Sequence, residues 1–187
     1  MLIYTGRFQP IHNGHLNLLR QILEEYPDEL VVVAVIEKAR LKEEDKNHFD
    51  LKVDREWNKK GFMFDPEENL KIICEILEEE FAGRVLVLRL PRPSKQNWQE
   101  VTELFNSDRT WVFTQNEESL DEWEEAKVKF YESQGDKVLR IKIKSKDING
   151  SDIRHFIENN EYEKLKGLVP EKEYEYIIAN SKSLSGN

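Results

Sequence analysis

Short apolar runs alternate with segments of helical spacing along almost the whole 187-residue chain. The expected strands are Leu2–Thr5, Leu30–Ile36, Val85–Leu90, Thr110–Phe113 and Val138–Ile143. The expected helices run from Asn13 to about Tyr26 and over Pro66–Phe81, Trp98–Phe105 and Leu120–Ser133. This alternation favours an α/β fold with a Rossmann-like, doubly wound parallel sheet and helices on both of its faces.

The length and composition of the chain fit a single compact domain. A chain of 187 residues, 39% of them hydrophobic, is long enough to bury a full core. We therefore expect one domain over residues 1–180. The segment 181–187, which contains Ser, Gly and Lys, is expected to be a flexible tail.

Charge and hydropathy exclude several classes of protein. The net charge of −9 argues against a nucleic-acid binder, which carries a basic footprint. No apolar stretch is long enough to cross a bilayer, and the first residues lack the basic segment and long apolar core of a secretory signal. We therefore expect a cytoplasmic location and no membrane partner. The single cysteine, Cys74, is expected to be a core residue of a helix rather than a nucleophile.

The most informative motif, Gly6-Arg7-Phe8-Gln9-Pro10-Ile11-His12-Asn13-Gly14-His15, lies between the first expected strand and the first expected helix. Gly6 allows the backbone to approach a ligand, and Asn13 is a candidate helix cap. A helix amino terminus is suited to phosphate, and His12 and His15 can both donate hydrogen bonds from its first turn. By itself, this histidine spacing is equally compatible with half of a metal site or with two solvated side chains.

A second motif, Ile148-Asn149-Gly150-Ser151-Asp152-Ile153-Arg154, lies near the other end of the chain. Gly150 frees the turn, and Ser151 can offer both a hydroxyl and an amide to phosphate. Arg154 follows one helical turn later on the same face. The alternative interpretation is a capped surface helix with an exposed arginine.

Both motifs together resemble a known family. The first resembles the signature of the nucleotidyltransferase superfamily that includes nicotinamide mononucleotide, pantetheine phosphate and glycerol phosphate transferases. Its Arg-Phe-Gln-Pro form is most similar to the archaeal-type nicotinamide mononucleotide adenylyltransferases. The second motif is similar to the family's Ile-Ser-Gly-Thr-Glu-Ile-Arg element. The resemblance implies a fold of the nucleotidyltransferase type in which the two helix starts converge on one triphosphate. It implies catalytic roles for His12, His15 and Arg154, and ATP binding by Gly6, Arg7, Phe8, Gly14, Gly150 and Ser151.

Two further segments resemble substrate-binding elements of the same family. The turn before Asn97 and Trp98 is similar to the segment that carries the nicotinamide-binding aromatic residue, which implies acceptor binding by these two residues. Trp98 could stack on a cationic pyridinium, or its helical spacing could place it in the core. Gln115 and Asn116 resemble a turn near adenine, where either side chain could bond the base edge or cap a helix.

The chain departs from this family at two places. The segment Glu37–Phe64 has no clean period and is expected to be a long loop with a short helix. It could be a binding loop or an insertion packed on the surface or against another subunit. Farther on, Asn69 stands where the similar element Phe-Thr-Ala-Gly-Glu-Arg has arginine. Asp65 and Pro66 explain that segment as a helix start, so we expect no catalytic role for Glu68.

The resemblance implies a specific reaction. The 5′-phosphate of nicotinamide mononucleotide attacks the α-phosphorus of ATP, which gives NAD and pyrophosphate. Mg²⁺ is expected to arrive with ATP rather than at a dedicated protein metal site, and a homo-oligomer is expected. Two alternatives stay open: adenylyl or cytidylyl transfer to a different phosphorylated acceptor, and a non-catalytic nucleotide-binding regulatory module.

Overall fold

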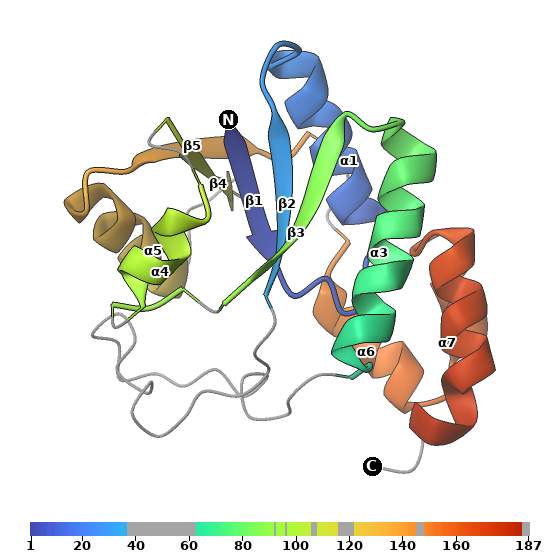
Figure 1. Ribbon diagram of the computed structural model, residues 1–187. Helices are drawn as coiled ribbons and strands as arrows, with labels where there is room; N and C mark the ends of the chain where they lie inside the picture. The colour runs from blue at the N-terminus through green and yellow to red at the C-terminus, as the bar shows by residue number, and fades with distance from the viewer. Residues whose placement is uncertain are drawn as a thin grey trace. The chain divides into compact units, whose positions relative to one another are not determined.

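The computed structural model describes residues 1–36, 63–91, 93–95, 97–105, 108–115, 122–144 and 148–184. Its elements follow one another along the chain (Figure 1): β1 (Leu2–Gly6), α1 (Asn13–Glu25), β2 (Val31–Ile36), α3 (Pro66–Phe81), β3 (Val85–Leu90), α4 (Trp98–Glu103), β4 (Thr110–Gln115), α5 (Glu122–Ser133), β5 (Lys137–Lys142), α6 (Gly150–Glu158), the 3₁₀ helix η2 (Tyr162–Leu165) and α7 (Glu171–Leu184). The expected strands and helices are confirmed to within one or two residues at their ends. The sequence patterns did not predict η2 or α7.

The five strands form one parallel sheet with the order β3-β2-β1-β4-β5. The order reverses beside β1, because β2 and β3 lie on one side of it and β4 and β5 on the other. Tyr4 of β1 pairs with Val33 of β2 and with Val112 of β4, so the carboxyl ends of these strands share one edge of the sheet. This order is that of a doubly wound sheet, which confirms the Rossmann-like class.

Burial along β2 shows that the sheet is covered on both faces. Val32 and Ala34 belong to the core on one face, together with residues of α4 and α5. The alternating residues Val31, Val33 and Val35 point to the opposite face and are buried as well. A strand buried on both sides is typical of parallel sheets, and this part of the expectation is confirmed.

The described residues form two compact units, each with its own hydrophobic core. The sheet unit comprises the described residues within 1–6, 29–62 and 84–143. Its core contains Ile3, Val32, Ala34, Leu90, Trp98, Val101, Phe105, Trp111, Phe113, Val128 and Tyr131. The helical unit comprises those within 7–28, 63–83 and 144–187, with Phe64, Ile153, Ile157, Leu165, Val169 and Ile177 in its core. The expectation of a single domain over residues 1–180 stays a prediction.

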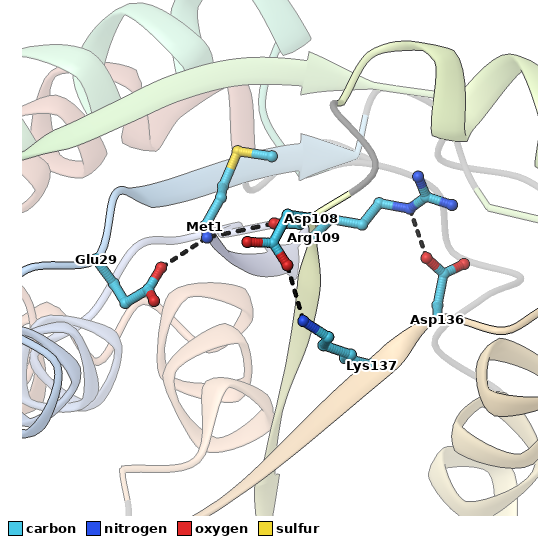
Figure 2. A network of polar contacts seen from close by, with 6 residues as sticks. All are labelled: Met1, Glu29, Asp108, Arg109, Asp136 and Lys137. Atoms are coloured by element: carbon cyan, nitrogen blue, oxygen red, sulfur yellow. Dashed lines mark hydrogen bonds and ion pairs between the residues drawn. The ribbon is translucent and has the colours of Figure 1, made fainter.

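A network of polar contacts joins the amino-terminal ends of four strands in the sheet unit, β1, β2, β4 and β5, and the Met1 ammonium links the two halves by donating to the Asp108 carbonyl at 3.4 Å (Figure 2). The ammonium group of Met1 donates to Glu29 at 2.6 Å, and Lys137 donates to Asp108 at 2.8 Å. Arg109 Nε lies 2.6 Å from Asp136 Oδ1, and this aspartate side chain is only 4% exposed. These pairs brace the edge of the sheet opposite to the carboxyl ends of its strands.

Local features of the helices test the remaining expectations. Cys74 is exposed, so its expected core position is wrong; Ile73, Ile76 and Leu77 occupy the buried face of α3 instead.

The expected tail 181–187 is helical as far as Leu184. Most of the expected long loop, residues 37–62, lies outside the described residues. In the part of the chain that the structure describes, no helix combines the length and apolar character needed to cross a membrane.

Candidate functional site

The first motif leaves the sheet at its carboxyl-end edge and opens α1. Gly6 is the last residue of β1, and the loop that follows belongs to the helical unit. Phe8 adopts a left-handed backbone with φ of 49°, an uncommon conformation for a residue other than glycine. The Phe8 ring is buried and meets the His15 ring edge-on, with 4.9 Å between centroids. The buried Phe8 ring therefore packs against the His15 ring.

The two histidines of this motif stack on each other at the start of α1. Their ring centroids are 3.6 Å apart and their planes 27° from parallel. The cap of α1 is His12, one residue earlier than the expected Asn13, and the backbone N–H of His12 donates to His15 Nδ1 at 3.1 Å. Since Nδ1 accepts this bond, the neutral imidazole of His15 carries its proton on Nε2, which makes Nε2 a donor.

Both histidines are electrically neutral at neutral pH. Burial first, and the nearby Arg154 cation second, lower the pKa of His12 to about 4. Burial, followed by His12 and Arg154, holds the pKa of His15 well below its usual value. The positive charge beside the rings is therefore that of Arg154, while the histidines can supply hydrogen bonds without charge.

The second motif brings Arg154 to the first. Asn149 caps α6 by accepting from the Ser151 amide at 2.9 Å. One amino group of Arg154 donates to Ser151 Oγ at 3.1 Å, and the other donates to the carbonyl of Gln9 at 3.3 Å. The interpretation of α6 as a capped helix is thus confirmed, but its arginine is half-buried between the motifs rather than exposed on the surface.

The His12 ring lies close to the backbone at Gly14 and Gly150, where a side chain would crowd it. A Cβ at Gly14 would lie 2.9 Å from His12 Nδ1, which is closer than real Cβ contacts allow. A Cβ at Gly150 would lie 3.3 Å from both His12 Nε2 and Arg154 Nη1. The two motifs, more than a hundred residues apart in the chain, therefore meet at His12.

The helix starts offer fewer amides than expected. The Ser151 amide is already bonded to Asn149, so the expectation that it is available to phosphate is wrong for this arrangement. The Asn13 amide donates to the Leu168 carbonyl at 2.8 Å, and its side chain donates to the Gly167 carbonyl at 2.9 Å. Side chains, rather than these backbone donors, are left to contact an anion.

Residues at the start of α3 hold the first motif from a second side. Asn69 is only 2% exposed, and its Nδ2 donates to the Arg7 carbonyl at 3.4 Å. Sequence reasoning missed this contact, although a polar residue on the apolar face of α3 was a visible signal. Asp65 caps α3 as expected, and Glu68 accepts from the Tyr176 hydroxyl at 2.7 Å.

The remaining candidate residues lie in the sheet unit. Trp98 is 8% exposed and packs among the rings of Trp111, Phe130 and Tyr131, so the core alternative is confirmed for it. Asn97 Oδ1 accepts from the amide and hydroxyl of Ser94, which braces the turn before α4. Gln115 is the last residue of β4 and is half-buried, and Asn116 lies outside the described residues.

Comparisons with known proteins agree on one family. A family model described as "Cytidylyltransferase-like" matches residues 3–156. A probable nicotinate-nucleotide adenylyltransferase of Clostridium acetobutylicum is 27% identical over 198 residues, which cover 95% of this chain and 96% of the relative. A nicotinamide-nucleotide adenylyltransferase of Thermococcus sibiricus is 28% identical over 180 residues, which cover 94% of this chain and 81% of the relative.

A solved structure shows the same fold. Plasmodium falciparum nicotinic acid mononucleotide adenylyltransferase, complexed with NaAD, aligns with a TM-score of 0.57 and 15% sequence identity. The alignment covers 95% of this chain and 94% of that one. At this identity, the likeness supports the arrangement of strands and helices.

Proposed function

Since the chain belongs to the cytidylyltransferase-like family and is a nucleotidyltransferase, we propose that it transfers the adenylyl group of ATP to nicotinamide mononucleotide. The products would be NAD and pyrophosphate. The observation that carries this proposal is the meeting of His12 with Gly150 and Arg154. It gathers two neutral imidazoles and one guanidinium, a donor set that suits a polyphosphate.

The proposed reaction is an in-line displacement at the α-phosphorus of ATP. An oxygen of the acceptor's 5′-phosphate forms a bond to this phosphorus, and the bond to the oxygen that bridges to the β-phosphate breaks. The attacking phosphate is already ionised at neutral pH, so no general base is required. The protein contributes by positioning both nucleotides and by stabilising charge on the α-phosphate and on the leaving pyrophosphate.

Each group of the site has a role in this scheme. His15 would donate from Nε2 to an oxygen of the α-phosphate, and His12 would contact the phosphates beside it. Arg154 and the Ser151 hydroxyl would hold the triphosphate, since their mutual bond already orients them. Arg7, Phe8 and the two motif glycines would shape the cradle. Gly6, Gln115, Asn116 and Asn97 keep their sequence-derived assignments as proposals, whereas Trp98 is left to the core.

Mg²⁺ belongs to this proposal as a companion of ATP. Among the described residues, no group of three or more His, Cys, Asp or Glu side chains could hold a metal ion. The donor set at His12, His15 and Arg154 suits phosphate oxygens rather than a cation. Mg²⁺ would therefore be bound by the phosphates and water, where it would neutralise charge. A homo-oligomeric assembly and a cytoplasmic location also stay proposals.

The acceptor is tested directly by pyrophosphate release. We expect release from ATP and Mg²⁺ that depends on nicotinamide mononucleotide, with NAD appearing in equal amount. Nicotinic acid mononucleotide is the second candidate, because the Clostridium relative is named for the nicotinate nucleotide. FMN, pantetheine phosphate and glycerol phosphate would be offered in parallel, and CTP in place of ATP.

Each outcome of this assay has a definite meaning. Release with another acceptor, or from CTP, would keep the mechanism but replace the proposed substrate. Nucleotide binding without release under any of these conditions would overturn the proposed substrate and point either to an acceptor outside this set or to a non-catalytic regulatory module.

The substitution Gly150→Ala tests the cradle itself. The added methyl would lie 3.3 Å from His12 Nε2 and Arg154 Nη1, so one of these groups must move. We expect ATP to bind roughly tenfold more weakly, equivalent to about 1.4 kcal/mol. The melting temperature should stay within a few degrees, because alanine suits a first helical position. Calorimetric titration and thermal unfolding check both, and an unchanged ATP affinity would show that ATP does not occupy this cradle.

A further inference from the structure

Gln9 fastens the loop of the first motif to the start of α3. Its side chain is 6% exposed, and its Oε1 accepts two successive backbone N–H groups, from Met63 at 2.8 Å and from Phe64 at 3.3 Å. Phe64 is itself buried in the core of the helical unit and meets the Tyr176 ring edge-on, with 5.2 Å between centroids. The Gln9 side chain is therefore bonded to a segment that is packed into the core of the helical unit.

The backbone of the same residue holds the arginine of the second motif. The Gln9 carbonyl accepts from Arg154 Nη1 at 3.3 Å, and the other Arg154 amino group donates to Ser151 Oγ. Two hydrogen bonds therefore orient the guanidinium, one to a flexible hydroxyl and one to a carbonyl, while the Glu158 carboxylate acts on it electrostatically. The position of that carbonyl depends in turn on the bonds that the Gln9 side chain makes.

A second buried amide supports the same loop. Asn69 Nδ2 donates to the Arg7 carbonyl, two residues before Gln9. One amide side chain therefore reaches from the loop to the backbone before α3, and another reaches from α3 back to the loop. Such a buried, mutually bonded pair of segments keeps backbone groups in place more precisely than solvent-exposed contacts would.

We propose that Gln9 is a positioning residue for the triphosphate: its side chain sets the carbonyl that aims Arg154 at the phosphates. This inference rests on the proposed function, because it takes ATP as the ligand of Arg154. Gln9 acts through Arg154 and does not itself touch the reacting atoms.

A double-mutant cycle tests the inference. ATP affinity is measured by calorimetric titration on wild type, Gln9→Ala, Arg154→Ala and the double variant. We expect Gln9→Ala to weaken ATP binding about tenfold in the wild-type background and less than twofold when Arg154 is already alanine. A merely structural role for Gln9 would lower affinity by the same factor in both backgrounds and would overturn the inference.

Gln21 supplies a matched control within the same unit. It is a buried glutamine of α1, and its Oε1 also accepts a backbone N–H, from Lys144 at 3.2 Å. Gln21→Ala removes a comparable bond far along the helix from the motif, so we expect a lower melting temperature with ATP affinity within twofold of wild type. An equal loss of ATP affinity in both single variants would assign the effect to general destabilisation.

A milder variant covers the case in which Gln9→Ala does not fold. Gln9→Asn keeps the amide but is one methylene shorter, so it should weaken ATP binding in the same direction and again only when Arg154 is present. Wild-type protein that binds no ATP would overturn the proposed function together with this inference. Wild-type protein that binds ATP but shows additive losses would overturn the inference alone.

Discussion

Replacing His15 with alanine is expected to lower the rate of adenylyl transfer by on the order of 100-fold or more, the usual scale for the loss of one donor to a developing oxyanion. His15 Nδ1 accepts from the His12 amide, so the neutral ring carries its proton on Nε2, the donor that we propose for the α-phosphate. Because the donor acts on charge that grows in the transition state, kcat should fall more than the KM for ATP rises. Steady-state pyrophosphate release measures both constants.

The control for this variant is His155→Ala. His155 is an exposed histidine of α6 in the same unit, next in sequence to Arg154 but outside the stacked pair. We expect its replacement to leave turnover within about twofold of wild type, and thermal unfolding should show both variants folded. If His15→Ala retained near-wild-type turnover, the assignment of His15 to the α-phosphate would be wrong.

The substitution Glu173→Gln is expected to stabilise the protein in alkaline solution. Glu173 is 0% exposed, and neither of its carboxylate oxygens has a hydrogen-bond partner among the described residues. Burial raises the pKa of this carboxyl to about 8 from its ordinary 4.5. The folded state therefore keeps a proton that the unfolded chain releases, and stability falls as the pH rises between these two values.

The size of this effect follows from the same two pKa values. Each pH unit in the window costs about 1.4 kcal/mol, so ionising this buried carboxyl costs up to about 5 kcal/mol by pH 8 to 9. Glutamine carries no charge and escapes this cost, whereas near pH 4 the two proteins should differ little. Urea unfolding at a series of pH values gives the free energies directly.

An exposed glutamate of α7 supplies the control for Glu173→Gln. Glu175→Gln changes an exposed side chain of the same helix, a kind of substitution that usually alters the free energy of unfolding by less than about 0.5 kcal/mol. His12, whose depressed pKa removes stability as the pH falls from 6.5 toward 4, is present in every variant and cancels in the difference. Parallel stability curves for wild type and Glu173→Gln would show that Glu173 is not buried as a proton-bearing group.

Local patterns determined which segments are strands and helices. The cap at Asp65, followed by proline at the first helical position, marked the beginning of α3 because these signals act within one turn of chain. The valine-rich run of β2 likewise indicated a strand buried on both faces. In contrast, α7 was not predicted, although Pro170 directly precedes it and Glu171 and Glu173 lie in its first turn.

Spacing alone did not decide which helical face would be covered. Cys74 lies among apolar residues in the sequence, as a core residue would. In the fold, however, the neighbouring elements bury the adjacent face of α3 and leave Cys74 exposed. For Trp98, the same helical spacing was compatible with a substrate-facing ring and with a core ring, and the surrounding aromatic residues of the sheet unit decided for the core. Burial is a property of the neighbours that the fold brings, which spacing does not specify.

For the candidate site, the sequence by itself determined the chemical groups: two histidines on one helical turn, a serine and arginine on another, and glycines beside them. Only the tertiary structure decided that His12 lies against Gly150 and that the Gln9 carbonyl accepts a hydrogen bond from Arg154. It also buried the Glu173 carboxyl where no described residue forms a hydrogen bond with it. The physical reason is range: caps, turns and periodicity act over a few residues, whereas these contacts join segments far apart in the chain and exist only once both have packed against a common core.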